Sequence, residues 1–315
     1  MAETRILFAA DLHGGETYFL KVLSLSKSSK VDILLLSGDL TGKAIVPIVK
    51  LDEDVYATSF FGVDYRMKQS ELPKIQNEIR KAGYYYYHCS RVEYEEFRAK
   101  PERVTELFDK LMQSMIESWI GKIEELLPNE MRVIISPGND DTFAIDDVLR
   151  NSRRVEYTIG KAIDLDDRHC MVSCDWVNPT PWNSPRECSE GELEKKLRAE
   201  IQRAPSTESL VCDFHAPPYN TVLDLAPKLG KDMRPKFFMG QPAMEHVGST
   251  SVRKVLEAFQ PELALHGHIH ESAGICKIKK TTCINPGSQY VEGIMHGCLV
   301  ILSPDKLDHQ LIIGG

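Results

Sequence analysis

Five short apolar segments, each followed at once by polar residues, constrain how this chain of 315 residues can fold more than any other feature. Each segment has the length and the apolar character of a strand buried on both faces. Helix-forming stretches separate several of the segments, so we expect parallel strands joined by right-handed crossovers. Functional side chains in such sheets lie in the loops that follow the strands. The segments span residues 5–10, 31–36, 131–135, 209–211 and 262–265.

The residues that follow these segments are mainly Asp, Asn and His. Carboxylate, amide and imidazole groups bind hard or borderline divalent cations, whereas softer metals recruit thiolates. The sequence therefore predicts one metal site assembled from distant pieces, with Mn, Fe, Zn, Ni or Co as the candidate ions. In an extended segment His268 and His270 point to opposite sides, so each can contact one ion of a pair, and Asp39 has two oxygens with which to bridge them. The five pieces are Asp11-Leu12-His13, Gly38-Asp39-Leu40, Gly138-Asn139-Asp140-Asp141, Asp213-Phe214-His215 and His266-Gly267-His268-Ile269-His270.

The acidic balance of the chain, with a net charge of -8, argues against the broad basic surface that general nucleic-acid binding needs. A small phosphorylated molecule is the expected partner, and a homo-oligomer remains open. The sequence has no recognisable signal peptide, and no apolar run approaches the ~18 residues of a membrane span, so we expect no membrane partner. Eight scattered cysteines without a Cys-x-x-Cys pair indicate reduced thiols and a cytoplasmic location.

The interval between the second and third polar pieces is unusually long. Asp39 and Asn139 lie about 100 positions apart, whereas a strand–helix–strand return needs only about 30 residues. We therefore expect a single domain over residues 1–315, with an inserted, largely helical segment at residues 44–99 beside the mouth of the site.

The pattern of this interval predicts particular elements. Apolar residues at helical spacing predict helices over residues 70–82 and 101–127. The four tyrosines at residues 84–87 indicate a strand with alternate rings facing inward, and stacking of these rings on a nucleobase is the alternative.

The order of the polar pieces, Asp-x-His, Gly-Asp, Gly-Asn, His and Gly-His-x-His, resembles that of the calcineurin-like metallophosphoesterase superfamily. Residues 251–272 and the Gly-Asn-Asp-Asp form of the third piece look closest to its Icc-related branch. The resemblance covers residues 1–43 and 131–302. It implies an α/β fold built as a four-layer α-β-β-α sandwich, and a dinuclear metal centre with a bridging hydroxide as the nucleophile. By position it places Asp11, His13, Asp39 and His270 on the first ion and Asp39, Asn139, His215 and His268 on the second.

One residue departs from the pattern of this superfamily. The Gly-Asn pair is usually followed by a histidine that assists the leaving group, and Asp140 stands there instead. Two nearby dications disfavour the protonated form of a carboxyl group, so Asp140 should be a poor proton donor near pH 7. The alternative is that Asp140 and Asp141 cap a helix over residues 143–149. His88 is a further candidate for the missing acid.

Three other features have both a functional and a structural interpretation. His266 either contacts a metal ligand or is a hydrogen-bonded core histidine. The Asn-Pro-Gly-Ser segment at residues 285–288 either orients the site or is a turn. Asn220, which follows His215 closely, is a candidate substrate contact.

These features together predict a metal-dependent phosphoesterase that hydrolyses phosphomonoesters or phosphodiesters. Asp39 and Asp140 are the expected catalytic residues, and Asn139, His215 and Asn220 are the expected substrate contacts. Two alternatives remain open. One is a non-catalytic scaffold or binding protein of the same fold, and the other is a nuclease of that fold, which would need a basic, aromatic-lined channel.

Overall fold

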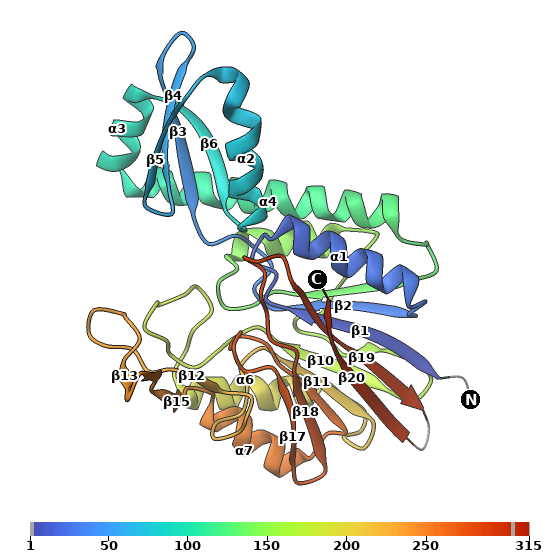
Figure 1. Cartoon of the computed structure of the whole chain (residues 1–315). Helices are drawn as coiled ribbons and strands as arrows, with labels where there is room; N and C mark the ends of the chain where they lie inside the picture. Colours follow the sequence, from blue (N-terminus) through green and yellow to red (C-terminus); the bar gives the residue numbers. More distant parts are fainter. Residues whose placement is uncertain (1–2, 304–305, 315) are drawn as a thin grey trace.

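The computed structural model describes residues 3–303 and 306–314. In this part of the chain two six-stranded mixed sheets face each other, and helices cover their outer faces (Figure 1). The first sheet has the order β20-β19-β1-β2-β7-β8. Its strands are β1 (Thr4–Ala10), β2 (Ile33–Ser37), β7 (Arg132–Ser136), β8 (Glu156–Tyr157), β19 (Met295–Ser303) and β20 (Lys306–Gly314).

The second sheet has the order β17-β18-β16-β11-β10-β9. Its central strands β10, β11, β16 and β18 run parallel, and the two outer strands are antiparallel to their neighbours. The strands are β9 (Ile163–Asp164), β10 (Cys170–Cys174), β11 (Leu210–Phe214), β16 (Leu263–Leu265), β17 (Gly274–Ile278) and β18 (Thr281–Asn285).

The layer between the sheets is an apolar core. Phe8 and Leu35 of the first sheet lie in one buried cluster with Met171, Val211 and Leu265 of the second. Full burial of one such side chain contributes about 1.5–3 kcal/mol. Because the central strands are covered on both faces, their sequences are continuously apolar rather than alternating, and this is why the sequence pattern located them.

Helices pack on the outer face of each sheet, which confirms the expected four-layer α-β-β-α sandwich. The indole ring of Trp119 stacks on Phe19 of the neighbouring helix, with the ring centroids 4.1 Å apart. α6 begins at a capping box in which Ser189 and Glu192 exchange hydrogen bonds with each other's backbone. The helices are α1 (Glu16–Ser28) and α4 (Pro101–Leu126), with the short η2 (Phe143–Ile145) and α5 (Asp146–Asn151), on the first sheet, and α6 (Glu190–Ile201) and α7 (Thr250–Phe259) on the second.

The inserted segment is not largely helical, which corrects the expectation. It contains a four-stranded sheet with the order β5-β4-β3-β6 and has a small core of its own (Figure 1). The helix expected over residues 70–82 is present, but the short alternating strands before it have no long apolar run that would mark them. The elements are β3 (Ile45–Asp52), β4 (Val55–Phe60), β5 (Val63–Met67), η1 (Gln69–Glu71), α2 (Leu72–Lys81), β6 (Tyr85–Ser90) and α3 (Arg91–Ala99).

The tyrosine run confirms the predicted strand, because three of its members lie in β6. Tyr85 is buried in the core between the first sheet and its helices, whereas Tyr84 and Tyr86 pack against the core of the insertion. The alternation follows from the two-residue period of a strand. The run therefore joins two cores, and this structural role accounts for three of its rings.

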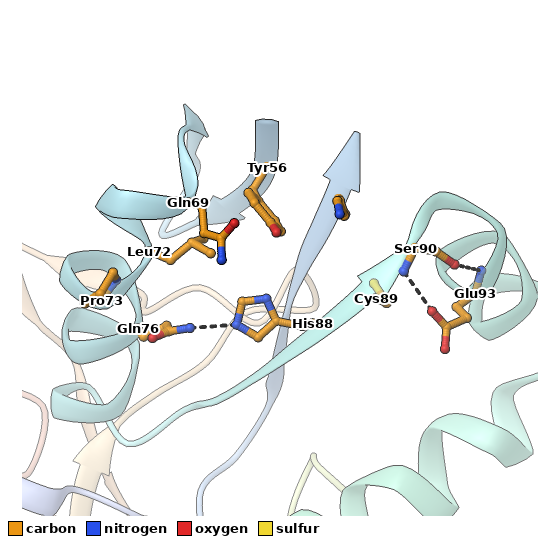
Figure 2. A pocket seen from close by; sticks show the side chains of 10 residues that line it. Tyr56, Gln69, Leu72, Pro73, Gln76, His88, Cys89, Ser90 and Glu93 are labelled. Atoms are coloured by element: carbon orange, nitrogen blue, oxygen red, sulfur yellow. Dashed lines mark hydrogen bonds between the residues drawn. The ribbon is translucent and has the colours of Figure 1, made fainter. Parts of the chain in front are cut away.

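His88 contacts residues of the insertion, and its described contacts do not join it to Asp39 or Asn139, so they do not support a role as the missing acid. It lines a depression of the insertion together with Tyr56 and Gln76, and its Nε2 lies 2.6 Å from Gln76 Nε2 (Figure 2). The depression is bounded on another side by the start of α3, where Ser90 and Glu93 form a capping box. The contacts of His88 therefore lie within this depression of the insertion.

We predict that Trp119→Ala destabilises the protein by about 3–5 kcal/mol, because it removes a buried ring that joins α4 to α1. Urea unfolding measures the loss. Leu126→Ala on the same helix is the matched control, since 39% of Leu126 is exposed, and it should cost less than half as much. Equal losses for the two variants would contradict this account of the helix interface.

Candidate metal centre

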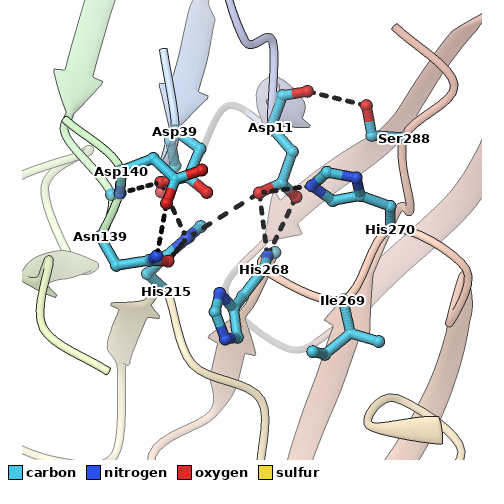
Figure 3. A network of polar contacts seen from close by, with 12 residues as sticks. Asp11, Asp39, Asn139, Asp140, His215, His268, Ile269, His270 and Ser288 are labelled. Atoms are coloured by element: carbon cyan, nitrogen blue, oxygen red, sulfur yellow. Dashed lines mark hydrogen bonds and ion pairs between the residues drawn. The ribbon is translucent and has the colours of Figure 1, made fainter. Parts of the chain in front are cut away.

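The carboxyl ends of strands from both sheets meet at one edge of the sandwich. β1, β2 and β7 are parallel neighbours in the first sheet, and β11 and β16 are parallel neighbours in the second. Asp11, Asp39 and Asn139 follow the first three strands, and His215 and His268 follow the other two. The structure therefore brings the polar pieces together in one cluster (Figure 3).

One group of the cluster contains Asp11, His13, Asp39 and His270. One potential ligand atom of each lies within 4.8 Å of those of the others. His13 Nε2 is 3.6 Å from Asp39 Oδ2, and His270 Nε2 is 3.7 Å from Asp11 Oδ1. These four are the residues that the resemblance places on the first ion.

The second group shares Asp39 with the first. Asp39, His215 and His268 also offer ligand atoms within 4.8 Å of one another. His215 Nε2 lies 3.4 Å from Asp39 Oδ1 and 3.0 Å from Asn139 Oδ1. Since Asp39 faces His13 with one oxygen and His215 with the other, its carboxylate stands between the two groups.

The backbone of the cluster is strained. A left-handed conformation is uncommon for residues other than glycine, and such strain gathers at functional sites. Tight loop contacts hold this conformation: at Gly38, an added Cβ would lie 2.0 Å from Nδ1 of His215, so only glycine fits. The residues with positive φ are Asp11 (55°), His13 (44°), Asp39 (38°) and His268 (67°).

The two carboxylates of the cluster are buried. Asp11 is 0% exposed and Asp39 is 2% exposed. Burial raises the pKa of Asp11 to about 7, and the charge of Asp39 adds to this, whereas His215 opposes it. Burial acts in the same direction on Asp39, but the charge of His215 and its hydrogen bond outweigh it and hold the pKa of Asp39 well below its usual range. The positive charge of His215 is therefore the main factor that keeps this carboxylate ionised.

Three of the four imidazoles around the carboxylates are neutral, whereas the burial of the fourth, His215, is outweighed by Asp39 and Asp11, which raise its pKa to about 9. Burial and the charge of His215 lower the pKa of His268 to about 3, and burial and Lys43 lower that of His270 to about 3. The pKa of His13 is lowered well below its usual value, chiefly by burial. Neutral imidazoles present the free lone pair that metal binding requires.

This donor set fits divalent cations. His13 Nε2 and His270 Nε2 lie 2.9 Å apart. Because both rings are neutral, at most one of these nitrogens donates a hydrogen in this contact, and the other presents a lone pair. Carboxylate oxygens, an amide oxygen and ring nitrogens converge on the same space without a thiolate, which is the set that Mn, Fe, Zn, Ni and Co accept. The residues present therefore fit the implied metal centre.

A polar contact between the sheets lies directly beneath the cluster. The buried carboxylate of Asp213 accepts hydrogen bonds from Ser37 (2.5 Å) and Ser136 (2.5 Å) of the first sheet and from Ser173 (2.9 Å) of the second. Three donors satisfy a group whose burial would otherwise be costly. Asp213 therefore fixes the relative position of the strands that carry the cluster.

Asp141 has a role other than the expected helix cap. Its carboxylate accepts hydrogen bonds from the backbone N–H groups of Leu40 (3.0 Å), Thr41 (2.9 Å) and Gly138 (2.8 Å). The capping prediction is wrong because η2 begins after Thr142 without a side-chain cap. Asp141 instead joins the loops that carry Asp39 and Asn139.

Asn139 is oriented by residues that the sequence analysis did not identify. Its Nδ2 donates to Ser184 Oγ at 2.7 Å, which leaves Oδ1 facing His215. Arg186, 1% exposed, donates from Nε to the carbonyl of Asp141 at 2.8 Å and forms an ion pair with Asp146. Nothing in the local sequence of residues 184–186 marks them, because Asn139 and Asp141, the partners through which they act on this loop, are 45 residues away.

Lys43 is a second residue that the sequence analysis missed. Its Nζ lies 3.1 Å from Asp140 Oδ2, and Asp140 also accepts a hydrogen bond from Asn139 Nδ2 at 2.9 Å. Burial and Asp39 raise the pKa of Asp140 to about 6, while Lys43 opposes the shift, so the carboxylate is mainly ionised at pH 7. Asp140 is thus beside the cluster, as expected, but paired with an ammonium group.

The remaining candidates divide into those near the cluster and those away from it. Ser288 donates to the carbonyl of Asp11 at 2.7 Å, so the 285–288 segment supports the first ligand loop. His266 is a buried core histidine whose Nδ1 contacts the carbonyls of residues 214 and 216, on either side of His215. Asn220 bonds through its backbone to Asp224 and Arg253, and the described contacts do not join it to the cluster.

We predict that the purified chain, dialysed with Mn²⁺ and then freed of unbound ions, retains two ions, and that Asp39→Ala retains fewer than one. Asp39 stands in both groups, so its loss should weaken both sites by more than about 100-fold. Elemental analysis measures the content. His246→Gln, which removes a His–Asp contact outside the cluster, should keep two ions; equal content in wild type and Asp39→Ala would refute a bridging role.

Known proteins share sequence and fold with this chain. No family model matches it. The uncharacterized protein MJ1162 of Methanocaldococcus jannaschii is 34% identical over 169 residues, which are 53% of this chain and 68% of the relative. A solved crystal structure that matches the whole of both chains has a TM-score of 0.61 at 15% identity, which shows a shared fold. The structure of TT1561 of Thermus thermophilus has a TM-score of 0.48 at 13% identity over 98% of this chain and 99% of that one. The chain belongs to the same family as MJ1162, and the order of its polar pieces on a four-layer sandwich resembles that of the calcineurin-like metallophosphoesterase superfamily.

Proposed function

We propose that this protein is a metal-dependent phosphoesterase that hydrolyses phosphomonoesters or phosphodiesters at a dinuclear centre. The observation that supports this most directly is the pair of buried ligand groups that share Asp39. Two divalent ions held there would polarise a phosphoryl oxygen and make water a nucleophile near neutral pH. The first ion would be held by Asp11, His13, Asp39 and His270, and the second by Asp39, Asn139, His215 and His268.

The chain's own residues would bind and orient the substrate. Asn139 and His215 would contribute to substrate binding through the second ion, which they would hold where a phosphoryl oxygen can reach it. Lys43 places an ammonium group, 39% exposed, next to the same region and would attract an anionic ester. By neutralising Asp140 in part, Lys43 also reduces the repulsion between that carboxylate and a phosphate.

We predict that the Mn²⁺-loaded chain hydrolyses phosphoesters and that Asp39→Asn lowers kcat/KM by about 100-fold or more, because a neutral amide cannot hold two cations. A panel of phosphomonoesters and phosphodiesters measures turnover. His246→Gln serves as the control and should retain wild-type rates. If the metal-loaded wild type hydrolyses no member of the panel, the chain is a non-catalytic binding protein and the proposal fails.

We predict that aryl phosphoesters are hydrolysed faster than alkyl phosphoesters by about 100-fold or more, because Asp140 is ionised at pH 7 and aryl oxides depart without a proton. Steady-state kinetics on matched pairs of esters test this. Asp140→His should raise the alkyl rate relative to the aryl rate, whereas Asp140→Asn should not. An equal preference of the wild type for the two classes would exclude this role of Asp140.

A further inference from the structure

An arm of the chain leaves the second sheet directly after His215. It covers residues 217–249, and its two ends are joined by hydrogen bonds from Ser249 N to Pro217 O (2.8 Å) and from Tyr219 N to Ser249 O (3.0 Å). Two short strand pairs form it, and β13 lies at its free end, away from both sheets (Figure 1). The strands are β12 (Leu225–Pro227), β13 (Phe237–Phe238), β14 (Gln241–Pro242) and β15 (Met244–His246).

The free end of the arm exposes three consecutive large apolar side chains. Phe237 is 67% exposed, Phe238 is 73% exposed and Met239 is 90% exposed. Met239 and Gly240 both have positive φ, as a tight two-residue hairpin turn requires. Because successive residues of a strand point to opposite sides, the two phenylalanines make both faces of this hairpin apolar.

Cations lie next to this tip. Lys231, Arg234 and Lys236 all precede the two phenylalanines, and no described carboxylate lies within ion-pair distance of these three side chains. The acidic residue between them, Asp232, accepts a hydrogen bond from the backbone of Arg234. Three exposed cations within six residues, with no described ion pair, thus precede the tip in a chain whose net charge is -8.

We propose that this hairpin binds the surface of an anionic lipid bilayer, with the Phe237-Phe238-Met239 tip in the interfacial region and the three cations against lipid phosphates. Apolar side chains beside basic ones are the combination that stable interfacial binding uses, because burial and electrostatic attraction add. A narrow tip that is apolar on both faces suits insertion among lipid chains. A flat protein surface would cover only one face and leave the other ring in water.

This inference does not depend on the phosphoesterase proposal. The expectation of no membrane partner rested on the lack of a long apolar run, and no helix in the described residues has the length and apolarity to span a bilayer. Binding to the surface of a bilayer needs neither a long apolar run nor a spanning helix. Since the arm begins two residues after His215, binding would also hold the metal cluster near the lipid surface.

Sedimentation of the full chain with vesicles tests the proposal. The chain should bind vesicles of phosphatidylcholine with about one third phosphatidylserine, and it should bind vesicles of phosphatidylcholine alone about tenfold more weakly or less. Replacing the tip by F237S, F238S and M239S together should lower binding to the anionic vesicles by about tenfold or more. Replacing Lys231, Arg234 and Lys236 by glutamine should remove the preference for anionic lipid.

The β4–β5 turn supplies a matched control. Phe61 and Gly62 form a two-residue hairpin turn with positive φ at both positions, and Phe61 is 63% exposed, but Asp64 follows instead of a run of cations. F61S should therefore bind vesicles like the wild type. Circular dichroism checks that each variant is folded.

Two results would overturn the proposal. One is a folded tip variant that binds the anionic vesicles as strongly as the wild type does. The other is failure of the wild type to bind the anionic vesicles. If sedimentation velocity then shows that the wild type is a dimer and the tip variant a monomer, the hairpin is a contact between two copies of the chain.

Discussion

The burial of two carboxylates at the meeting point of two sheets is the constraint on which the rest of this structure depends. Asp11 and Asp39 are almost completely removed from water, and a buried charge is stable only when it is paired with opposite charge or coordinates a cation. Of the nearest imidazole groups, His13 and His270 are neutral and only His215 has a raised pKa, so protonated histidine supplies only part of the compensation. Divalent cations would supply the rest of the positive charge. The surrounding loops place carboxylate, amide and imidazole lone pairs where such ions would bind.

The scaffold keeps these loops in place by contacts between segments that are distant in sequence. Asp213 accepts hydrogen bonds from serines of both sheets, and Asp141 joins the loops that carry Asp39 and Asn139. Arg186 donates a hydrogen bond to the carbonyl of Asp141 and so holds the Asn139 loop. Hydrogen bonds to Asp11 from Ser288 and His268, and to Asp39 from the backbone of Asp140, hold these residues in their strained backbone conformation. Rigid strands and buried hydrogen bonds thus give the cluster a preorganised geometry, which phosphoryl transfer requires more than it requires reactive side chains.

Two additions to the sandwich follow directly after ligand loops. The insertion begins after the Asp39 loop, and an added Cβ at its Gly83 would lie 2.2 Å from the carbonyl of His13, so its base contacts the cluster. The arm begins after His215 and ends in an apolar, basic tip. We propose that the insertion lies beside the mouth of the site.

The sequence by itself determined the buried strands, most of the helices and the residue types of the metal cluster, because these depend on local apolar patterns and on polar residues at strand ends. It did not determine the sheet of the insertion, whose short strands carry only a weak alternating pattern. Lys43, Ser184 and Arg186 act through partners that lie far along the chain, and their positions depend on strand register and loop packing. Only the tertiary structure decided that Asp141 joins loops instead of capping a helix, because hydrogen bonds between distant segments leave no periodic signal in the sequence.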